Sequence, residues 1–128
     1  MHKKFLQLAA LLAALSVILG AFGAHSLKQF LPADTLQTFE TAVRYQLYHA
    51  FALFVAGILY KEFPGKAITW AGYLFVGGIV LFSGSLYLLC YIKYQQLSSL
   101  LWVGAVTPLG GLLFVGGWIS LLAGVRKN

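Results

Sequence analysis

A polar segment, residues 44–49 (RYQLYH), runs directly into the apolar segment 50–60. On a helix, Tyr45 and Gln46 lie about one turn before His49, so the three side chains share a face. Imidazole changes charge near neutral pH, and ionisable groups in a membrane segment usually face the bundle interior or a water-filled cavity. This pattern predicts orientation of a ligand or transfer of a proton, and either role needs partner residues on other segments.

Polar residues also stand near one end of each other apolar segment, and alternating helix directions would gather these ends in one leaflet. Ser83, Ser85 and Thr107 favour structural hydrogen bonds between helices, because hydroxyls often cross-link membrane helices. Tyr48 and Tyr87 are typical of an interfacial aromatic belt. For His25 and His49, functional and structural roles weigh equally. The candidate cluster comprises His25, Glu40, Arg44, Tyr45, Gln46, His49, Ser83, Ser85, Tyr87 and Thr107.

The composition indicates lipid as the solvent of this chain. Of its 128 residues, 60% are hydrophobic and only 9% are charged, which is far from the balance of a soluble domain. A bilayer core about 30 Å thick needs about 20 apolar residues per helix, and the chain contains four apolar runs of that order. We therefore predict an all-α fold, in which residues 1–128 form a single integral membrane domain, a bundle of four transmembrane helices.

The spans are expected at about 5–25, 41–60, 67–92 and 97–125, with 26–40 as an interfacial segment. Asp34 and Gln37 resemble a capping box, which predicts a helix start near Thr35. Pro108 falls inside the fourth span and predicts a kink there. The first apolar run is longer than the core of a typical signal peptide, so we expect it to remain as a helix.

Basic residues mark the ends of the spans and do not gather into one patch. The chain has nine Lys and Arg against three Asp and Glu, for a formal net charge of +6. This distribution indicates a lipid bilayer as partner, and no nucleic acid. Counting alternate ends of the spans, the positive-inside rule predicts that both termini are cytoplasmic. The richer side has Lys3, Lys4, Lys61, Lys66, Arg126 and Lys127, and the poorer side has Lys28, Arg44 and Lys93.

Glycines recur every seven residues in the fourth span, at Gly110, Gly117 and Gly124. Small residues let helix backbones approach closely, so this stripe predicts a helix contact. Gly-rich faces of the third and fourth helices could also meet other copies of the chain, which predicts a homo-oligomer. Cys90 stands alone in an apolar run and is interpreted as a buried, inert thiol. His2, next to the amino terminus, is expected to be exposed.

Four motifs, in this order along the chain, resemble the domain-of-unknown-function 423 family. The resemblance covers essentially the whole chain. Members of that family are small bacterial inner-membrane proteins and are similar to eukaryotic transmembrane protein 256. The resemblance implies a four-span, multi-pass protein of the bacterial inner (plasma) membrane with no established activity, so it adds fold and location but no chemistry. The motifs are Gly20-Ala21-Phe22-Gly23-Ala24-His25, Tyr45-Gln46 with His49, Phe82-Ser83-Gly84-Ser85-Leu86-Tyr87, and Thr107-Pro108 with Gly110-Gly111.

Three classes of function remain open. In a binding or conducting protein, the polar cluster would hold a small ligand, a lipid or a proton, with His25 and His49 as relay or orienting groups, Arg44 attracting an anionic group and Glu40 balancing that charge. In a structural or assembly protein, the cluster would only hold the bundle together, and the glycine stripe of the fourth span would be the surface that meets a larger membrane complex. A haem or metal redox protein could use the two histidines as ligands. Enzymatic activity is disfavoured because no nucleophile elbow or acid pair is evident, and we assign no catalytic, cofactor or metal residue.

Overall fold

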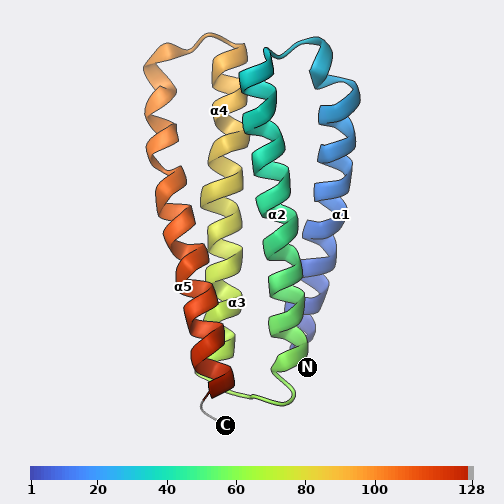
Figure 1. Ribbon diagram of the computed structural model, residues 1–128, viewed down its shortest axis with the longest axis vertical. Coiled ribbons are helices and arrows are strands. Elements are labelled where there is room, and N and C mark those ends of the chain that lie inside the picture. Colours follow the sequence, from blue (N-terminus) through green and yellow to red (C-terminus); the bar gives the residue numbers. More distant parts are fainter. Residues whose placement is uncertain (127–128) are drawn as a thin grey trace.

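The computed structural model describes residues 1–126, in which all regular structure is helical. Four long rods run up and down the molecule, and each is long and apolar enough to cross a membrane (Figure 1). Their lengths are 27, 27, 29 and 29 residues. At about 1.5 Å per residue each rod exceeds the thickness of a bilayer core, so the rod ends extend into the headgroup layers.

The rods are built from five α-helices and three short segments of other helix type within the described residues. The first rod is α1 (Lys3–His25) followed by the 3₁₀ turn η1 (Leu27–Gln29), and the second is α2 (Ala33–Leu59). The third rod joins α3 (Lys66–Gly78), the π-helical turn η2 (Ile79–Ser83) and α4 (Gly84–Tyr94). The fourth is the 3₁₀ segment η3 (Ser98–Ala105) followed by α5 (Thr107–Arg126).

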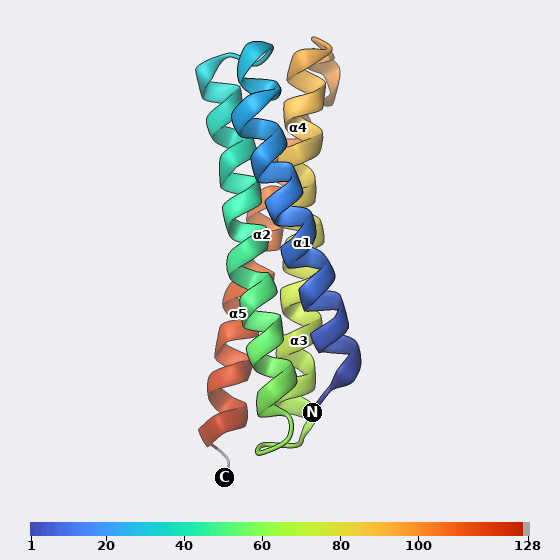
Figure 2. The same ribbon diagram turned by 90° about the vertical axis from the view of Figure 1, so that its right-hand side faces the viewer.

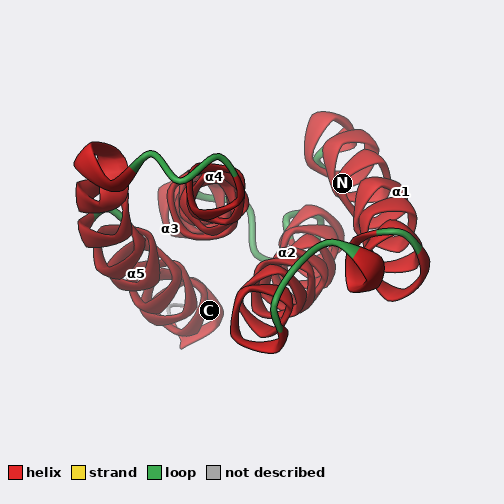
Figure 3. Ribbon diagram, turned by 90° about the horizontal axis from the view of Figure 1, so that it is seen from above, coloured by secondary structure: helices red, strands yellow, loops and turns green. Residues whose placement is uncertain are grey.

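The second and third rods form the centre of the bundle. Helix α2 contacts both α3 and α4, whereas α1 packs mainly on α2 and α5 packs mainly on α3. Seen from above, α1 and α5 lie on opposite sides of the molecule (Figure 3). In the most apolar stretch of each rod, the share of buried residues is 17% for the first rod and 22% for the fourth. It is 44% for the second rod and 39% for the third. The outer rods therefore present most of their apolar side chains outward, as expected in lipid.

Helix α1 crosses the face of the bundle obliquely (Figure 2). Near its start, Phe5 is buried and packs against Gly72 of α3, where a larger residue would collide with the ring. His2 was expected to be exposed, but it is partly covered and caps the helix, because its Nδ1 accepts from the Phe5 backbone N–H at 3.4 Å. Its ring also stacks on Phe5 with 3.8 Å between centroids. The amino terminus is thereby fixed against α2 and α3.

Helix α2 begins at Ala33, directly after Pro32, and continues without interruption to Leu59. Residues 33–40 therefore belong to the same rod as the segment 41–60. The expected capping box is wrong: Pro32 precedes the helix, and Asp34 lies inside its first turn. Pro32 has no N–H to offer and its fixed φ of −58° suits the residue that opens a helix, so proline takes the place expected for a polar cap.

The third and fourth rods change helix type where they cross. In the third, the π-helical turn Ile79–Ser83 separates α3 from α4. In the fourth, the 3₁₀ segment ends at Ala105, and Pro108 is the second residue of α5, where its missing N–H breaks no helical hydrogen bond. At the crossing, a side chain at Gly110 would collide with the backbone of Phe82 in the π turn. Glycine is thus required for this close approach of two backbones.

The glycine stripe of α5 faces the inside of the molecule. Gly110, Gly117 and Gly124 are buried, and a Cβ at Gly117 would lie 2.7 Å from the ring of Phe75 on α3. The stripe is therefore the close helix contact that the spacing predicts, formed within one chain. Because these three glycines are covered within the chain, the stripe is not open to a larger membrane complex, which corrects that expectation; a homo-oligomer through other Gly-rich faces stays a prediction.

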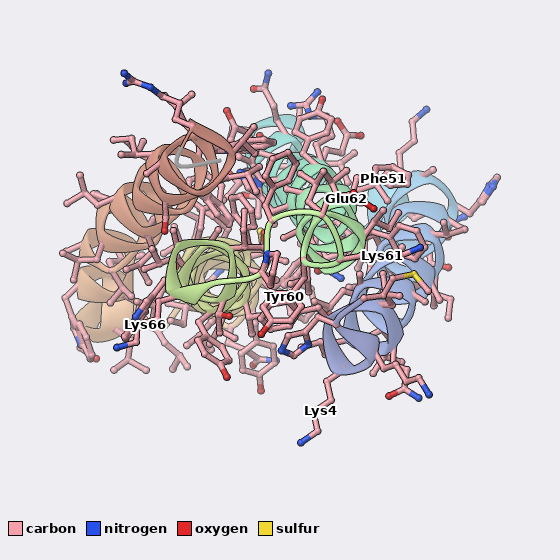
Figure 4. The ribbon with its side chains drawn as sticks, turned by 90° about the horizontal axis from the view of Figure 1, so that it is seen from below. Lys4, Phe51, Tyr60, Lys61, Glu62 and Lys66 are labelled. Carbon is pink, nitrogen blue, oxygen red and sulfur yellow. The ribbon has the colours of Figure 1, made fainter. Side chains whose placement is uncertain are left out.

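Both described ends of the chain lie at the same end of the bundle, together with the α2–α3 connection (Figure 1). Viewed from that end, Lys4 and Lys66 reach outward around the rim and Lys61 lies on the connection (Figure 4). The opposite end consists of η1 and the α4–η3 connection. The end with the chain termini therefore carries Lys4, Lys61 and Lys66, three of the basic residues counted on the richer side.

Candidate functional site

A buried amide at the centre of α2 links three rods. Gln46 is only 4% exposed, and its Nε2 donates to the backbone carbonyl of Leu12 on α1 at 2.9 Å. The hydroxyl of Tyr87 on α4 donates to Gln46 Oε1 at 2.7 Å. A backbone carbonyl can only accept, so the NH₂ group must face Leu12 and the amide oxygen must face Tyr87. This geometry fixes the direction of both hydrogen bonds.

Two serines of the third rod, at and just after the π turn, make polar contacts with the neighbouring rods. Ser83 is fully buried, and its hydroxyl donates to the carbonyl of Ala42 on α2 at 2.7 Å. Ser85 and Thr107 share a hydrogen bond of 2.6 Å between their hydroxyls, which joins α4 to the start of α5. These contacts have the structural character that the sequence favoured for all three residues.

His49 is buried between α2 and α5, with both ring nitrogens occupied. Its Nδ1 lies 2.8 Å from the carbonyl of Tyr45, and Trp118 Nε1 donates to its Nε2 at 3.2 Å. Because the carbonyl must accept and the indole must donate, the ring is a neutral imidazole with its proton on Nδ1. It stacks on Phe114 with 3.5 Å between ring centroids. Sequence reasoning missed Trp118, since an aromatic residue in an apolar run carries no sign of a polar contact.

The remaining candidates do not join this group. His25 is exposed at the end of α1, whereas the path from Ala33 to His49 covers about 24 Å of helix. The two histidines therefore cannot ligate one haem or metal or relay a proton directly. Glu40 and Arg44 are exposed, and Arg44 donates to the Thr41 hydroxyl at 3.3 Å.

The polar contacts cluster around the middle of the rods. Gln46 is the central residue of α2, which runs from Ala33 to Leu59. Among the described residues, every buried side-chain nitrogen or oxygen has a hydrogen-bond partner. In that part of the chain, no group of three or more His, Cys, Asp or Glu side chains is placed to hold a metal ion. No buried polar side chain of the network thus needs a ligand as its partner, and space for a ligand must be sought beside the network.

Such a space lies between the first rod and α4. A cavity of about 340 Å³ opens near the end of the bundle formed by η1 and the α4–η3 connection. Tyr87 is the one lining residue that belongs to the sequence-derived cluster; the others come from α1, η1, the η1–α2 connection, α2 and α4. No lining residue is charged. The lining comprises Phe22, Leu27, Phe30, Leu31, Phe39, Tyr87, Cys90, Tyr91 and Tyr94.

Sequence reasoning missed this cavity, although part of its pattern is visible. Tyr87, Tyr91 and Tyr94 have the i, i+4, i+7 spacing that places three phenols on one face of α4. What the sequence does not reveal is the oblique course of α1, which separates its carboxyl end from α4 (Figure 2). Cys90, on the same wall, is buried as expected, and its thiol donates to the carbonyl of Thr35 at 3.5 Å.

Four apolar rods whose polar groups are paired inside the bundle define a multi-pass helical membrane protein. The family described as Protein of unknown function (DUF423) matches residues 19–111, and the chain belongs to this family. It is 46% identical over 126 residues to the UPF0382 membrane protein YwdK of Bacillus subtilis, covering 98% of each chain. It is 42% identical over 125 residues to a UPF0382 membrane protein of Staphylococcus saprophyticus, covering 98% of each chain. No solved structure matches the chain.

Proposed function

We propose that the chain is a binding protein of the bacterial plasma (inner) membrane, which holds a neutral, largely apolar molecule in the cavity between the first rod and α4. The observation that carries this proposal is the cavity itself, about 340 Å³ in volume and lined by nine residues without a charge. Ligand pockets in proteins start at about 300 Å³ and are lined mainly by apolar and aromatic side chains. The cavity meets both criteria.

The chemistry of the lining selects the class of ligand. Six of the nine lining residues are aromatic, and their rings favour flat or ring-bearing molecules through stacked and edge-on contacts. An ionised group inside the cavity would lose its water without gaining a counter-charge, which is strongly unfavourable. A neutral membrane component therefore fits better than an anionic headgroup.

In this proposal the polar cluster supports the site. The contacts of Gln46 with Leu12 and Tyr87 hold the first rod, α2 and α4 together directly beside the cavity. Ser83 joins the third rod to α2, whereas the Ser85–Thr107 and His49–Trp118 contacts join the central rods to α5. Of the sequence-derived candidates, Tyr87 alone contacts the ligand.

The distribution of basic side chains supports an orientation with both termini in the cytoplasm. Lys61 and Lys66 lie at the end of the bundle that carries the termini (Figure 4). Basic residues are enriched on the cytoplasmic side of membrane proteins. The cavity then lies at the outer-leaflet end, where molecules can enter it from the bilayer.

Native mass spectrometry of the protein released from its own membranes tests the binding function. Leu27, on η1, lines the cavity, so Leu27→Trp should fill it and abolish any bound neutral molecule that the unchanged protein retains. Leu112 is 67% exposed on the lipid face of α5, so Leu112→Trp is a matched control that should retain the molecule. If the unchanged protein carries no such molecule, or if both variants retain it equally, the proposal is wrong.

A structural or assembly role is the second candidate. It is favoured by the complete pairing of buried polar groups among the described residues, because such a cluster needs no ligand. A partner would contact this chain on the exposed apolar sides of α1 and α5 rather than on the buried glycine stripe. A stoichiometric partner in a pull-down after mild solubilisation would support this role, and a chain recovered alone would count against it.

A further inference from the structure

We infer that the ligand of this cavity carries a hydroxyl group and donates its hydrogen bond to Tyr87, so that the site takes a neutral phenol or alcohol and disfavours the corresponding ether, ester or ketone. The inference rests on the proposed function, because it names the chemical class bound in the same cavity. It follows from the direction of the hydrogen bonds behind the cavity wall.

The proton of Tyr87 is committed away from the cavity. Gln46 must turn its NH₂ group to the Leu12 carbonyl, so its Oε1 faces Tyr87 and can only accept. The Tyr87 hydroxyl therefore donates its only proton to Gln46 in the 2.7 Å hydrogen bond. What remains on the Tyr87 oxygen is acceptor capacity, and a ligand group that meets this oxygen must be a donor.

The second polar group of the inner wall, the thiol of Cys90, also donates its hydrogen bond away from the cavity. The thiol of Cys90 donates to the backbone carbonyl of Thr35 at 3.5 Å, again away from the cavity. Cys90 is 4% exposed, whereas Tyr91 and Tyr94, which also line the cavity, are 58% and 55% exposed. The buried part of the lining thus presents acceptors only, and free phenol donors stand at the rim.

This polarity separates molecules that otherwise have the same shape. A neutral phenol can place its ring among the aromatic side chains and its O–H against Tyr87. A methyl ether or a quinone-type carbonyl offers only acceptors, so its oxygen would lose its hydrogen bond to water without finding a donor on the inner wall. We expect the hydroxyl form of a ligand pair to bind about tenfold more tightly than the acceptor-only form.

Equilibrium binding of 4-pentylphenol and 4-pentylanisole to the protein in lipid nanodiscs tests the inference. Empty nanodiscs of the same lipid give the partitioning background for each probe. The unchanged protein should favour the phenol by about tenfold. Tyr87→Phe should reduce this preference to near unity, and Tyr91→Phe, which changes a phenol at the rim of the same wall, should retain it.

Gln46→Met provides an independent test, because it releases the Tyr87 proton while keeping an unbranched side chain of similar length. The Leu12 carbonyl still accepts from the Ser16 hydroxyl at 2.9 Å in this variant. With its proton free, Tyr87 can donate to an ether, so the anisole should gain affinity relative to the phenol. The comparison of two probes on the unchanged protein needs no variant and holds even if a substitution prevents folding.

The outcomes separate the inference from the function on which it rests. If neither probe binds above the empty nanodiscs, the binding function is wrong and the inference falls with it. If both probes bind the unchanged protein with equal affinity, the cavity is a ligand site but the hydroxyl preference is wrong. A preference that persists in Tyr87→Phe would likewise overturn the role of Tyr87.

Discussion

Gln46 shows how one side chain can set the polarity of a neighbouring surface. Its NH₂ group faces a helix carbonyl on α1, and its oxygen faces a phenol on α4. Neither partner could exchange roles, because the carbonyl has no proton and the amide oxygen has none either. A buried amide near the middle of a membrane rod is costly without partners, and both of its ends are satisfied.

Removing the hydroxyl of Tyr87 should therefore destabilise the bundle. Tyr87→Phe leaves Gln46 Oε1 without its donor, and we expect the free energy of unfolding to fall by about 1 kcal/mol. Unfolding in mixed micelles, followed by circular dichroism, measures the change. Tyr94→Phe is the control, because Tyr94 is 55% exposed, and it should leave stability unchanged. Equal stability of the two variants would contradict the buried role of the Tyr87 hydroxyl.

His49 and Trp118 should be energetically coupled through their 3.2 Å hydrogen bond. In a double-mutant cycle with His49→Phe and Trp118→Phe, the effects should be non-additive by about 1 kcal/mol, since either change alone removes the whole interaction. The phenyl ring at position 49 keeps the stacking on Phe114. A parallel cycle with Trp102→Phe should be additive, because Trp102 lies on η3 and is 64% exposed. Additivity in both cycles would show that the bond contributes nothing.

At the scale of elements, the crossing of the third and fourth rods depends on local departures from the α-helix. The π turn Ile79–Ser83 brings the Phe82 backbone against Gly110 and the Ser83 hydroxyl onto α2. π-helical turns commonly occur where a helix must aim a side chain or admit a neighbour. Here one turn meets both needs, and it lies next to the start of α5.

Two adjacent glycines at this crossing should respond in opposite ways to alanine. At Gly110 a Cβ would collide with the Phe82 backbone, so Gly110→Ala should lower stability by about 1 to 3 kcal/mol. At Gly111 the nearest atom to a new Cβ is 4.0 Å away, so Gly111→Ala should be neutral or stabilising through helix propensity. Thermal unfolding of the two variants in one detergent gives the comparison. A stable Gly110→Ala protein would contradict the close backbone contact.

The elements that could be predicted from the sequence are those set by composition and spacing. The apolar runs indicated four rods, and the seven-residue spacing of Gly110, Gly117 and Gly124 indicated the α5 contact now seen against the third rod. The π turn was not predictable, because residues 79–83 are as apolar as the α-helical residues on either side of them and no local pattern marks the change of helix type. Helix α2 also starts earlier than expected, since Pro32 rather than Asp34 precedes it.

The site was only partly predictable, because its contacts also depend on how the rods pack against one another. Residue type revealed which side chains need partners, and the hydroxyls of Ser83, Ser85 and Thr107 have them. Which partner each finds depends on how far along each rod it lies. His49 lies deep within α2 and is therefore far from His25. No local sequence pattern indicates this separation. The cavity depends on the oblique course of α1, so it becomes visible only with the whole bundle (Figure 2).

At the scale of the whole molecule, the bundle is an open arrangement in which each outer rod is held mainly by one inner rod. Helix α1 rests on α2 and α5 rests on α3, and the two outer rods lie on opposite sides (Figure 3). The connection η1 and the α4–η3 connection both lie at the cavity end. The side of the membrane on which that end stands therefore decides from which leaflet the proposed ligand would enter the cavity.

Cysteine labelling in whole cells should locate the cavity end at the outer surface. In a Cys90→Ala background, a cysteine introduced as Ser98→Cys at the α4–η3 connection should react with an impermeant maleimide on intact cells. A cysteine introduced as Lys61→Cys at the α2–α3 connection should react only after permeabilisation, because the basic rim formed by Lys4, Lys61 and Lys66 favours the cytoplasm (Figure 4). Both positions are exposed, so access rather than burial decides the result. The reverse pattern would assign the cavity to the cytoplasmic leaflet, and the ligand would then have to come from that side of the membrane.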